Sequence, residues 1–188
     1  MLSGDAPDTM VQECNWNACG CSSSMSSRKH DLFLRLRNEW LNILQLLNEI
    51  KTQEKEYHAI GNWTTFDMLS HLAGWAVWRV DAIKELLKTG HTDFSHLTHS
   101  TVDKFNADKV ADRVNHTWEQ IVQEVEYADE EWIALLSSLS EEDIFVSTHF
   151  RSPSWETLAE WVQIALDHYA HHARAIIEWR ARTSNSYP

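Results

Sequence analysis

A stripe of regularly spaced residues near the C-terminal end constrains the fold more than any other feature. Between positions 158 and 179, every third or fourth residue is apolar or a histidine: Leu158, Trp161, Ala165, His168, His172, Ala175 and Trp179. This spacing is typical of a bundle helix that turns one face toward its neighbours. Two consecutive positions of the stripe carry histidine where leucine would be ordinary. Histidines four residues apart lie on one helix face, so both imidazoles can reach one metal ion.

Apolar periodicity predicts three further helices, and only five glycines and three prolines occur among 188 residues, 43% of which are hydrophobic. The predicted helices cover residues 28–52, 64–88, 107–139 and 152–182, and the last begins at Ser152 or Ser154. Links between bundle helices usually have about 2–8 residues, so the long 89–105 link is predicted to be a crossover or a lid over a pocket. The sequence therefore predicts an all-α four-helix bundle with a long crossover between its second and third helices.

The first 27 residues differ in composition from the rest of the chain. They are rich in serine, asparagine and aspartate and lack apolar periodicity, which predicts a disordered N-terminal tail over residues 1–27. The bundle is then expected over residues 28–182, followed by a polar C-terminal tail over 183–188. All three cysteines, Cys14, Cys19 and Cys21, fall in the N-terminal tail. We interpret them as solvated thiols, because no fourth ligand with zinc-site spacing follows; a metal or redox site is the alternative.

The charge balance of the chain is strongly acidic. The formal net charge is −12, which we take as an argument against nucleic-acid or anionic-membrane partners, since such sites need clustered Lys and Arg. One face of the predicted 107–139 helix is interpreted as a solvated acidic surface, formed by Glu119, Glu124, Glu126, Asp129, Glu130 and Glu131. No apolar run reaches the roughly 18 residues of a membrane span, and the N-terminus does not resemble a secretory signal. A cytoplasmic protein is the expectation.

The histidine pair has two interpretations. A buried imidazole needs partners for its nitrogens, so His168 and His172 are either hydrogen-bonded core residues or metal ligands. Tyr169 follows His168 where a zinc-peptidase helix would carry glutamate, so that activity is excluded. A third ligand should come from another helix, and His71 is the only histidine within the predicted 64–88 helix. Three imidazoles would leave a position for water or substrate, as in catalytic sites.

Other histidines have weaker claims to a role at this site. His171 lies about 80° around the helix from the stripe, so we interpret it as a residue at the rim, with replacement of one ligand as the alternative. His116 and His149 are isolated in the sequence and are interpreted as surface or loop residues.

Three segments together carry a family resemblance. They are Trp63–Trp75, which contains His71; the pair Phe105-Asn106; and Asp167–His172. In this order they resemble the DinB/YfiT-like superfamily, which includes the metal-binding domain of mycothiol-dependent maleylpyruvate isomerase. The resemblance covers about residues 28–182. It implies a four-helix bundle with a long crossover and a divalent metal ion held by His71, His168 and His172. The cysteine-bearing tail and the extra His171 depart from the family pattern.

The resemblance also implies a class of activity. We expect a metal-dependent hydrolase or thiol S-transferase that acts on a small electrophilic molecule, with a low-molecular-weight thiol as a candidate cosubstrate. Three imidazoles suit Zn, Ni, Cu or Fe. Asn106, Trp75 and Trp78 are candidates for the pocket wall, with core or capping roles as the alternative. The competing hypotheses are a bundle that sequesters a small molecule or metal without turnover, and a purely structural bundle; a homodimer is compatible with each.

Overall fold

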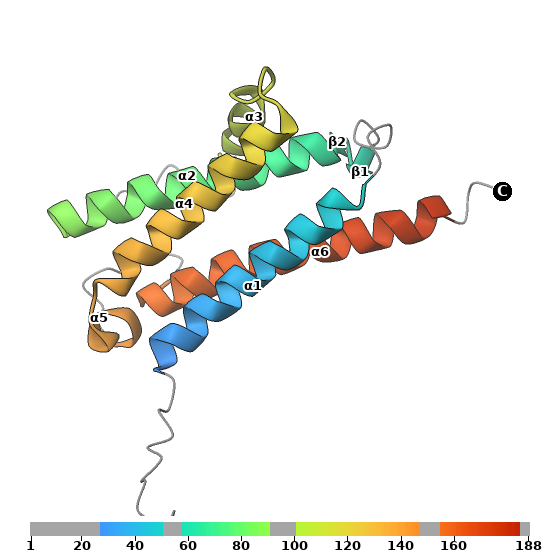
Figure 1. Cartoon of the computed structure of the whole chain (residues 1–188). Helices are drawn as coiled ribbons and strands as arrows, with labels where there is room; N and C mark the ends of the chain where they lie inside the picture. Colours follow the sequence, from blue (N-terminus) through green and yellow to red (C-terminus); the bar gives the residue numbers. More distant parts are fainter. Residues whose placement is uncertain (1–26, 51–57, 91–100, 147–154, 185–188) are drawn as a thin grey trace, which may run out of the picture.

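Four long helices form the body of the described chain. The computed structural model describes residues 27–50, 58–90, 101–146 and 155–184. In chain order the long helices are α1 (Arg28–Asn48), α2 (Thr65–Thr89), α4 (Trp118–Ser137) and α6 (Leu158–Ser184). Two shorter helices, α3 (Val102–Ala111) and α5 (Glu141–Phe145), lie in the connections, and β1 (His58–Ile60) pairs antiparallel with β2 (Trp63–Thr64) just before α2. The predicted all-α bundle is confirmed (Figure 1).

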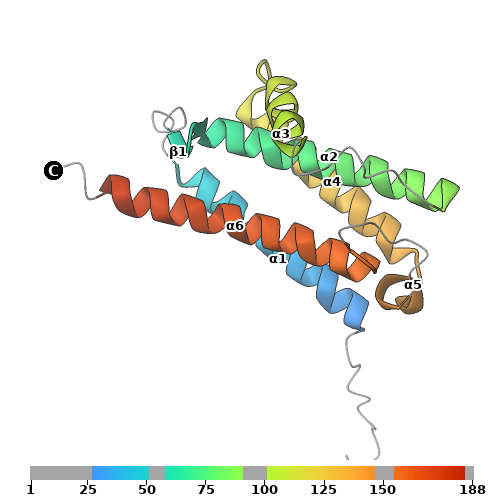
Figure 2. The same ribbon diagram turned by 180° about the vertical axis from the view of Figure 1, so that it is seen from behind.

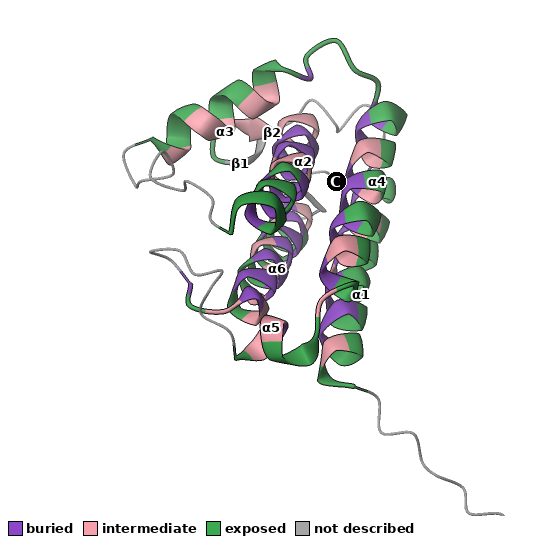
Figure 3. Cartoon of the chain, turned by 90° about the vertical axis from the view of Figure 1, so that its left-hand side faces the viewer, coloured by how far each residue is buried: buried purple, intermediate pink, exposed green. Residues whose placement is uncertain are grey.

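The long helices pack in two pairs. Helix α2 packs chiefly against α4, and α1 packs chiefly against α6 (Figure 2). Each helix turns a buried face inward and an exposed face outward, as Figure 3 shows. The core holds side chains from all four helices, among them Leu36, Ile43, Leu47, Met68, Leu72, Ile83, Ile121, Val125, Trp132, Leu158, Tyr169 and Ile176. Removal of these apolar surfaces from water is the main stabilising term of such a bundle.

Helix α2, which carries His71, begins and ends where the sequence indicates. The Thr64 hydroxyl accepts a hydrogen bond from the Asp67 backbone N–H over 3.0 Å, and the Asp67 carboxylate accepts one from the Thr64 backbone N–H over 2.9 Å. This reciprocal pair is a capping box. At the other end, Gly90 has a φ of 77°, a left-handed conformation that glycine adopts without steric cost and that ends the helix.

The predicted 107–139 helix is wrong, because the chain breaks there into α3 and α4. Thr117 and Gln120 form a capping box that starts α4 as a new helix. The break was not predicted because Val110 and Val114 continue the apolar spacing of α4 toward the N-terminus. Arg113 stabilises the break: its Nε and Nη2 donate to the two carboxylate oxygens of Glu124 over 2.7 and 2.8 Å. The crossover from α2 to α4 therefore contains a helix of its own.

Two other boundaries differ from those predicted. Helix α6 begins at Leu158 rather than at Ser152 or Ser154, and those two serines and Pro153 lie outside the described residues. The link between α4 and α6 contains α5, started by a capping box between Ser140 and Asp143. The cysteines, and the tails predicted for residues 1–27 and 183–188, lie almost wholly outside the described residues. Among the residues described, no helix is long and apolar enough to cross a membrane.

Candidate metal centre

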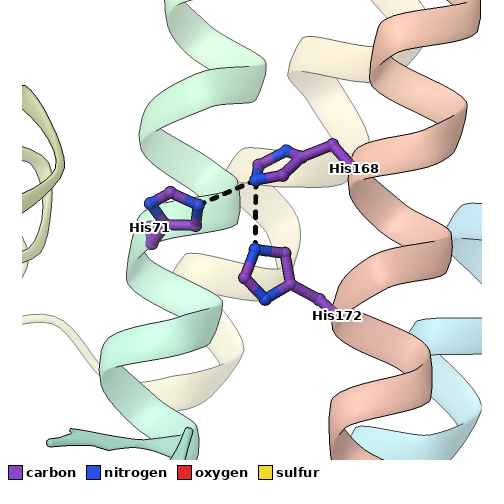
Figure 4. A group of neighbouring side chains, drawn as sticks. All are labelled: His71, His168 and His172. Atoms are coloured by element: carbon purple, nitrogen blue, oxygen red, sulfur yellow. Dashed lines mark hydrogen bonds between the residues drawn. The ribbon is translucent and has the colours of Figure 1, made fainter. Parts of the chain in front are cut away.

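Three histidines from two helices converge beside the core. His71 comes from α2, and His168 and His172 come from successive turns of α6 (Figure 4). The Nε2 atom of His168 lies 2.8 Å from Nε2 of His71 and 3.0 Å from Nε2 of His172. One nitrogen from each ring can be chosen so that all lie within 4.8 Å of one another. The structure thus brings together the three histidines selected from the sequence; their binding of a metal ion stays a prediction.

The environment keeps these imidazoles neutral. Burial, followed by the charges of His172 and Arg79, lowers the pKa of His71 to about 3. Burial and then the charge of His171 lower the pKa of His172 to about 4, and burial holds the pKa of His168 well below its usual value. Neutral imidazole is the form that binds a metal ion, so the three side chains present free lone pairs at physiological pH.

Hydrogen bonding alone does not account for the convergence of three Nε2 atoms. In a neutral imidazole each ring nitrogen either donates one hydrogen bond or accepts one, so Nε2 of His168 cannot satisfy both neighbours at once. A tetrahedral zinc ion with Zn–N bonds of about 2.0–2.1 Å would space its ligand atoms roughly 3.4 Å apart, so the two Nε2 pairs now 2.8 and 3.0 Å apart would each have to separate by about half an ångström. The donor set therefore fits a divalent ion.

The second ring nitrogen, Nδ1, lacks a hydrogen bond to any described residue in two of the three histidines. Nδ1 of His71 and Nδ1 of His172 are buried and have no hydrogen-bond partner among the described residues. Metal-ligating histidines usually donate this second N–H to a carboxylate, carbonyl or water. The support for a metal ion therefore comes from the three Nε2 atoms that face one another, and not from hydrogen bonds to Nδ1.

The cluster lies in the wall of a cavity of about 670 Å³. The lining is mainly aromatic and apolar and comes largely from α2, α3 and α6: Asn62, Trp63, His71, Trp75, Trp78, Arg79, Val102, Asp103, Asn106, Trp161, Ile164, Ala165, His168, His171 and His172. A cavity of this volume with a few polar groups is typical of small-molecule sites. All three residues selected as pocket-wall candidates, Asn106, Trp75 and Trp78, line it.

Helix α3 closes one side of this cavity through close contact with α2. The indole Nε1 of Trp75 donates a hydrogen bond to Oδ1 of Asn106 over 2.9 Å. Next to Trp75, Gly74 gives α3 room: a Cβ atom at that position would lie 2.4 Å from Cβ of Lys109. Most of the 89–105 link that was predicted to be a crossover or a lid lies outside the described residues; the helix that follows, α3, packs on α2 through the Trp75–Asn106 hydrogen bond and the space left by Gly74.

A second polar cluster adjoins the cavity and was not predicted from the sequence. Nη2 of Arg79 donates to Oδ1 of Asp129 over 2.9 Å and to the Tyr169 hydroxyl over 2.7 Å. Asp129 is only 5% exposed, so the interpretation of this residue as part of a solvated acidic face is wrong. The available signals were an arginine within the apolar arc of α2 and a tyrosine directly after His168.

Among the residues that the structure describes, no further histidine joins the cluster. His171 is exposed and lines the cavity, with its ring edge against the His172 ring at a centroid distance of 5.2 Å. It therefore lies at the rim, as expected. His116 is exposed, and His149 lies outside the described residues.

Three solved structures share this fold at low sequence identity. The protein described as Sibling Lethal Factor Precursor, DfsB, is 14% identical, with a TM-score of 0.71 over 84% of this chain and 98% of its own. An uncharacterised protein from Escherichia coli UTI89 is 18% identical, with a TM-score of 0.69 over 83% of this chain and 94% of its own. The colibactin self-resistance protein ClbS, solved in complex with a dsDNA, is 14% identical, with a TM-score of 0.70 over 84% of this chain and 98% of its own. A search of curated proteins found no match.

The ClbS complex corrects one expectation from the sequence. Nucleic acid was excluded as a partner on the net charge of −12, yet a protein of this fold is solved in complex with a dsDNA. The exclusion is wrong because net charge is a sum over the whole surface, whereas phosphate contacts depend on where individual Lys and Arg side chains lie.

A family assignment follows from the sequence. The sequence pattern of one family matches residues 35–176, well over half of the chain, and this span contains all three clustered histidines. The chain belongs to the DinB superfamily.

Proposed function

We propose that this protein is a metal-dependent enzyme that acts on a small electrophilic molecule, as a hydrolase or as a thiol S-transferase. The observation that carries the proposal is the convergence of three neutral imidazoles in the wall of an aromatic cavity. Clustered lone pairs beside a cavity large enough for a small molecule combine the two requirements of a catalytic metal site, ligands and access.

The residues would divide the work as follows. His71, His168 and His172 would hold a divalent ion and leave part of its coordination sphere open toward the cavity. Such an ion, when bound, supplies Lewis acidity and lowers the pKa of a coordinated water or thiol. Because three imidazoles suit several metals, Zn, Ni and Fe remain the candidates.

The cavity walls would bind and orient the substrate. The tryptophan rings would cover its apolar body and exclude water, which strengthens polar interactions inside the site. Oδ1 of Asn106 already accepts from Trp75, so its amide N–H groups are left to donate to a substrate. A low-molecular-weight thiol is the cosubstrate we propose for the transferase reaction.

A second candidate function is sequestration without turnover. Asp103 is the only carboxylate among the cavity-lining residues described, and it is exposed on α3, so no buried general base accompanies the histidines. ClbS, which shares the fold, is described as a self-resistance protein. A protein that binds a toxic small molecule in this cavity would need no such base.

Metal content and turnover test the proposal together. Protein purified without a histidine tag or added metal is analysed for its elements, and an epoxide and an activated aryl ester are then offered with and without glutathione. We expect about one divalent ion per chain and turnover that His168→Ala abolishes and His171→Ala retains. Metal-dependent binding of these compounds without turnover would favour sequestration, and absence of metal would refute the proposal.

Two further expectations from the sequence stay predictions: a homodimer, which light scattering on the same sample tests, and a cytoplasmic location.

A further inference from the structure

Arg79 carries hydrogen-bonding capacity that the described part of the chain does not use. The residue is only 3% exposed, and its hydrogen bonds to Asp129 and Tyr169 both come from Nη2. Nε has no partner among the described residues, and none of them bonds Nη1 either. A guanidinium has five N–H donors: Nη2 uses its two, the single donor of Nε is fully enclosed, and the two donors of Nη1 are the ones that a ligand can reach. A buried charged group with unsatisfied donors is strongly unfavourable unless a ligand or water completes it.

The position of Arg79 directs this capacity toward the histidine cavity. Arg79 lines that cavity together with Trp78 and Trp161, whose rings meet edge to face at a centroid distance of 6.1 Å. Asp129, which offsets the charge of Arg79, does not belong to this lining; it lines a separate groove beside α1 residues such as Phe33 and Trp40. The cationic side chain of Arg79 therefore lines the cavity, whereas the carboxylate of Asp129 that pairs with it does not.

The distance between Arg79 and the histidines suits one small molecule. His71 and Arg79 are eight residues apart on α2, which corresponds to about 12 Å along the helix axis. Tryptophan side chains lie on the wall between them: Trp75 is in ring contact with His71 at 6.3 Å and with Trp78 at 5.3 Å. A planar molecule with an anionic end can lie on these rings with its other end at the histidines.

We propose that the cavity binds small aromatic carboxylates, with Arg79 binding the carboxylate group and Trp78 and Trp161 covering the ring. This inference rests on the proposed function, to which it adds the class of substrate. The Asp129 and Tyr169 side chains fix the guanidinium through Nη2, so Arg79 is held in place before the ligand arrives and less ordering is needed on binding. Charge-assisted hydrogen bonds from arginine to a carboxylate supply the selectivity over neutral analogues.

Calorimetric titration with a matched pair of probes tests the inference. Naphthalene-2-carboxylate and naphthalene-2-carboxamide have nearly the same shape and differ in charge. We expect the carboxylate to bind the wild-type chain about tenfold more tightly than the amide, as one charge-assisted contact would give. The double variant Arg79→Met/Asp129→Asn removes both buried charges together and should lose the preference, whereas Arg174→Met, at an exposed arginine of α6, should keep it. Should the double variant fail to fold, Arg79→Lys decides, since lysine keeps the charge but loses the planar fork and should weaken the preference severalfold.

The same titrations on chelator-treated protein separate this inference from the metal proposal. A preference that survives chelation but disappears with Arg79 supports the inference whether or not the protein binds metal. Equal binding of the two probes by the wild-type chain would overturn it. So would a preference that persists in the double variant, or one that chelation removes while Arg79 is intact, because the ion and not the guanidinium would then hold the carboxylate.

Discussion

The Tyr169 hydroxyl donates a hydrogen bond to Oδ2 of Asp129 over 2.7 Å, although the two residues are 40 positions apart in the chain. Both side chains are buried, and burial raises the pKa of Tyr169 well above its usual value, so the hydroxyl keeps its proton. Arg79 donates to both partners. The three side chains thereby link α2, α4 and α6 beside the histidines. Each of them forms its buried hydrogen bonds with the other two.

Removal of the Tyr169 hydroxyl should destabilise the bundle. Tyr169→Phe leaves Asp129 without one donor and Arg79 without one acceptor in a buried setting, which costs about 1–3 kcal/mol of the free energy of unfolding. Urea denaturation followed by circular dichroism measures this change. Tyr127→Phe is the matched control, because Tyr127 is 69% exposed and should change the free energy by less than about 0.5 kcal/mol. Equal stability of the two variants would show that the network contributes little.

A chelator should lower the melting temperature of the wild-type chain. An ion bound only by the folded state stabilises it by about 2.7 kcal/mol at a free concentration one hundred times Kd, and its removal reverses this. His168→Ala should melt at a lower temperature than the wild type and show no further decrease with chelator. His171→Ala should respond as the wild type does, because this exposed histidine lies outside the cluster. A chelator without effect on any variant would mean that the three histidines are core residues.

Local patterns in the sequence were sufficient to predict α1, α2 and most of α6 and to select the three histidines that converge. The stripe of α6 depends only on the 3.6-residue period, which places His168 and His172 on one face whatever surrounds them. The start of α2 depends on Thr64 and Asp67, which are three residues apart. These features depend on residues that are close together in the chain, so they can be predicted from the sequence.

The features that were missed depend on competition or on distant partners. Between α3 and α4, the apolar period continues while the capping box of Thr117 and Gln120 starts a new helix, and the spacing alone did not reveal which signal prevails. Asp129 lies beside Ala128 on the inner face of α4, and its burial requires the cation of Arg79, which is 50 positions away. A pattern within one helix does not contain that information.

The metal-free chain should lose stability as the pH falls below about 6.5. His71 and His172 have folded-state pKa values of about 3 and about 4, below the value near 6.5 that an unfolded histidine has. The unfolded chain therefore binds more protons below pH 6.5. The free energy of unfolding should decrease toward pH 4 by up to about 1.4 kcal/mol per pH unit for each histidine that takes up a proton only on unfolding.

Urea denaturation at several pH values between 7 and 4 measures this slope in chelated protein. The variant His71→Gln/His172→Gln should show a shallower slope than the wild type, and His116→Gln, at an exposed position, should leave it unchanged. Comparison of slopes removes the contribution of the carboxylates, which all three chains share. Parallel slopes in the wild type and the double variant would contradict the prediction.

Replacement of Gly74 should detach α3 from α2 without unfolding the bundle. In Gly74→Ala, the new Cβ would lie 2.4 Å from Cβ and 2.7 Å from Cγ of Lys109, and because these atoms are at the base of that side chain, α3 has to move. Alanine favours the helical state of α2 by about 1 kcal/mol, which offsets much of the strain in the global free energy of unfolding. We therefore expect faster amide hydrogen exchange over Val102–Ala111 and little change over α4. Adding Lys109→Gly removes the clashing atoms and should restore the protection seen with Lys109→Gly alone. Unchanged exchange in Gly74→Ala would mean that α3 is held chiefly by the hydrogen bond from Trp75 to Asn106.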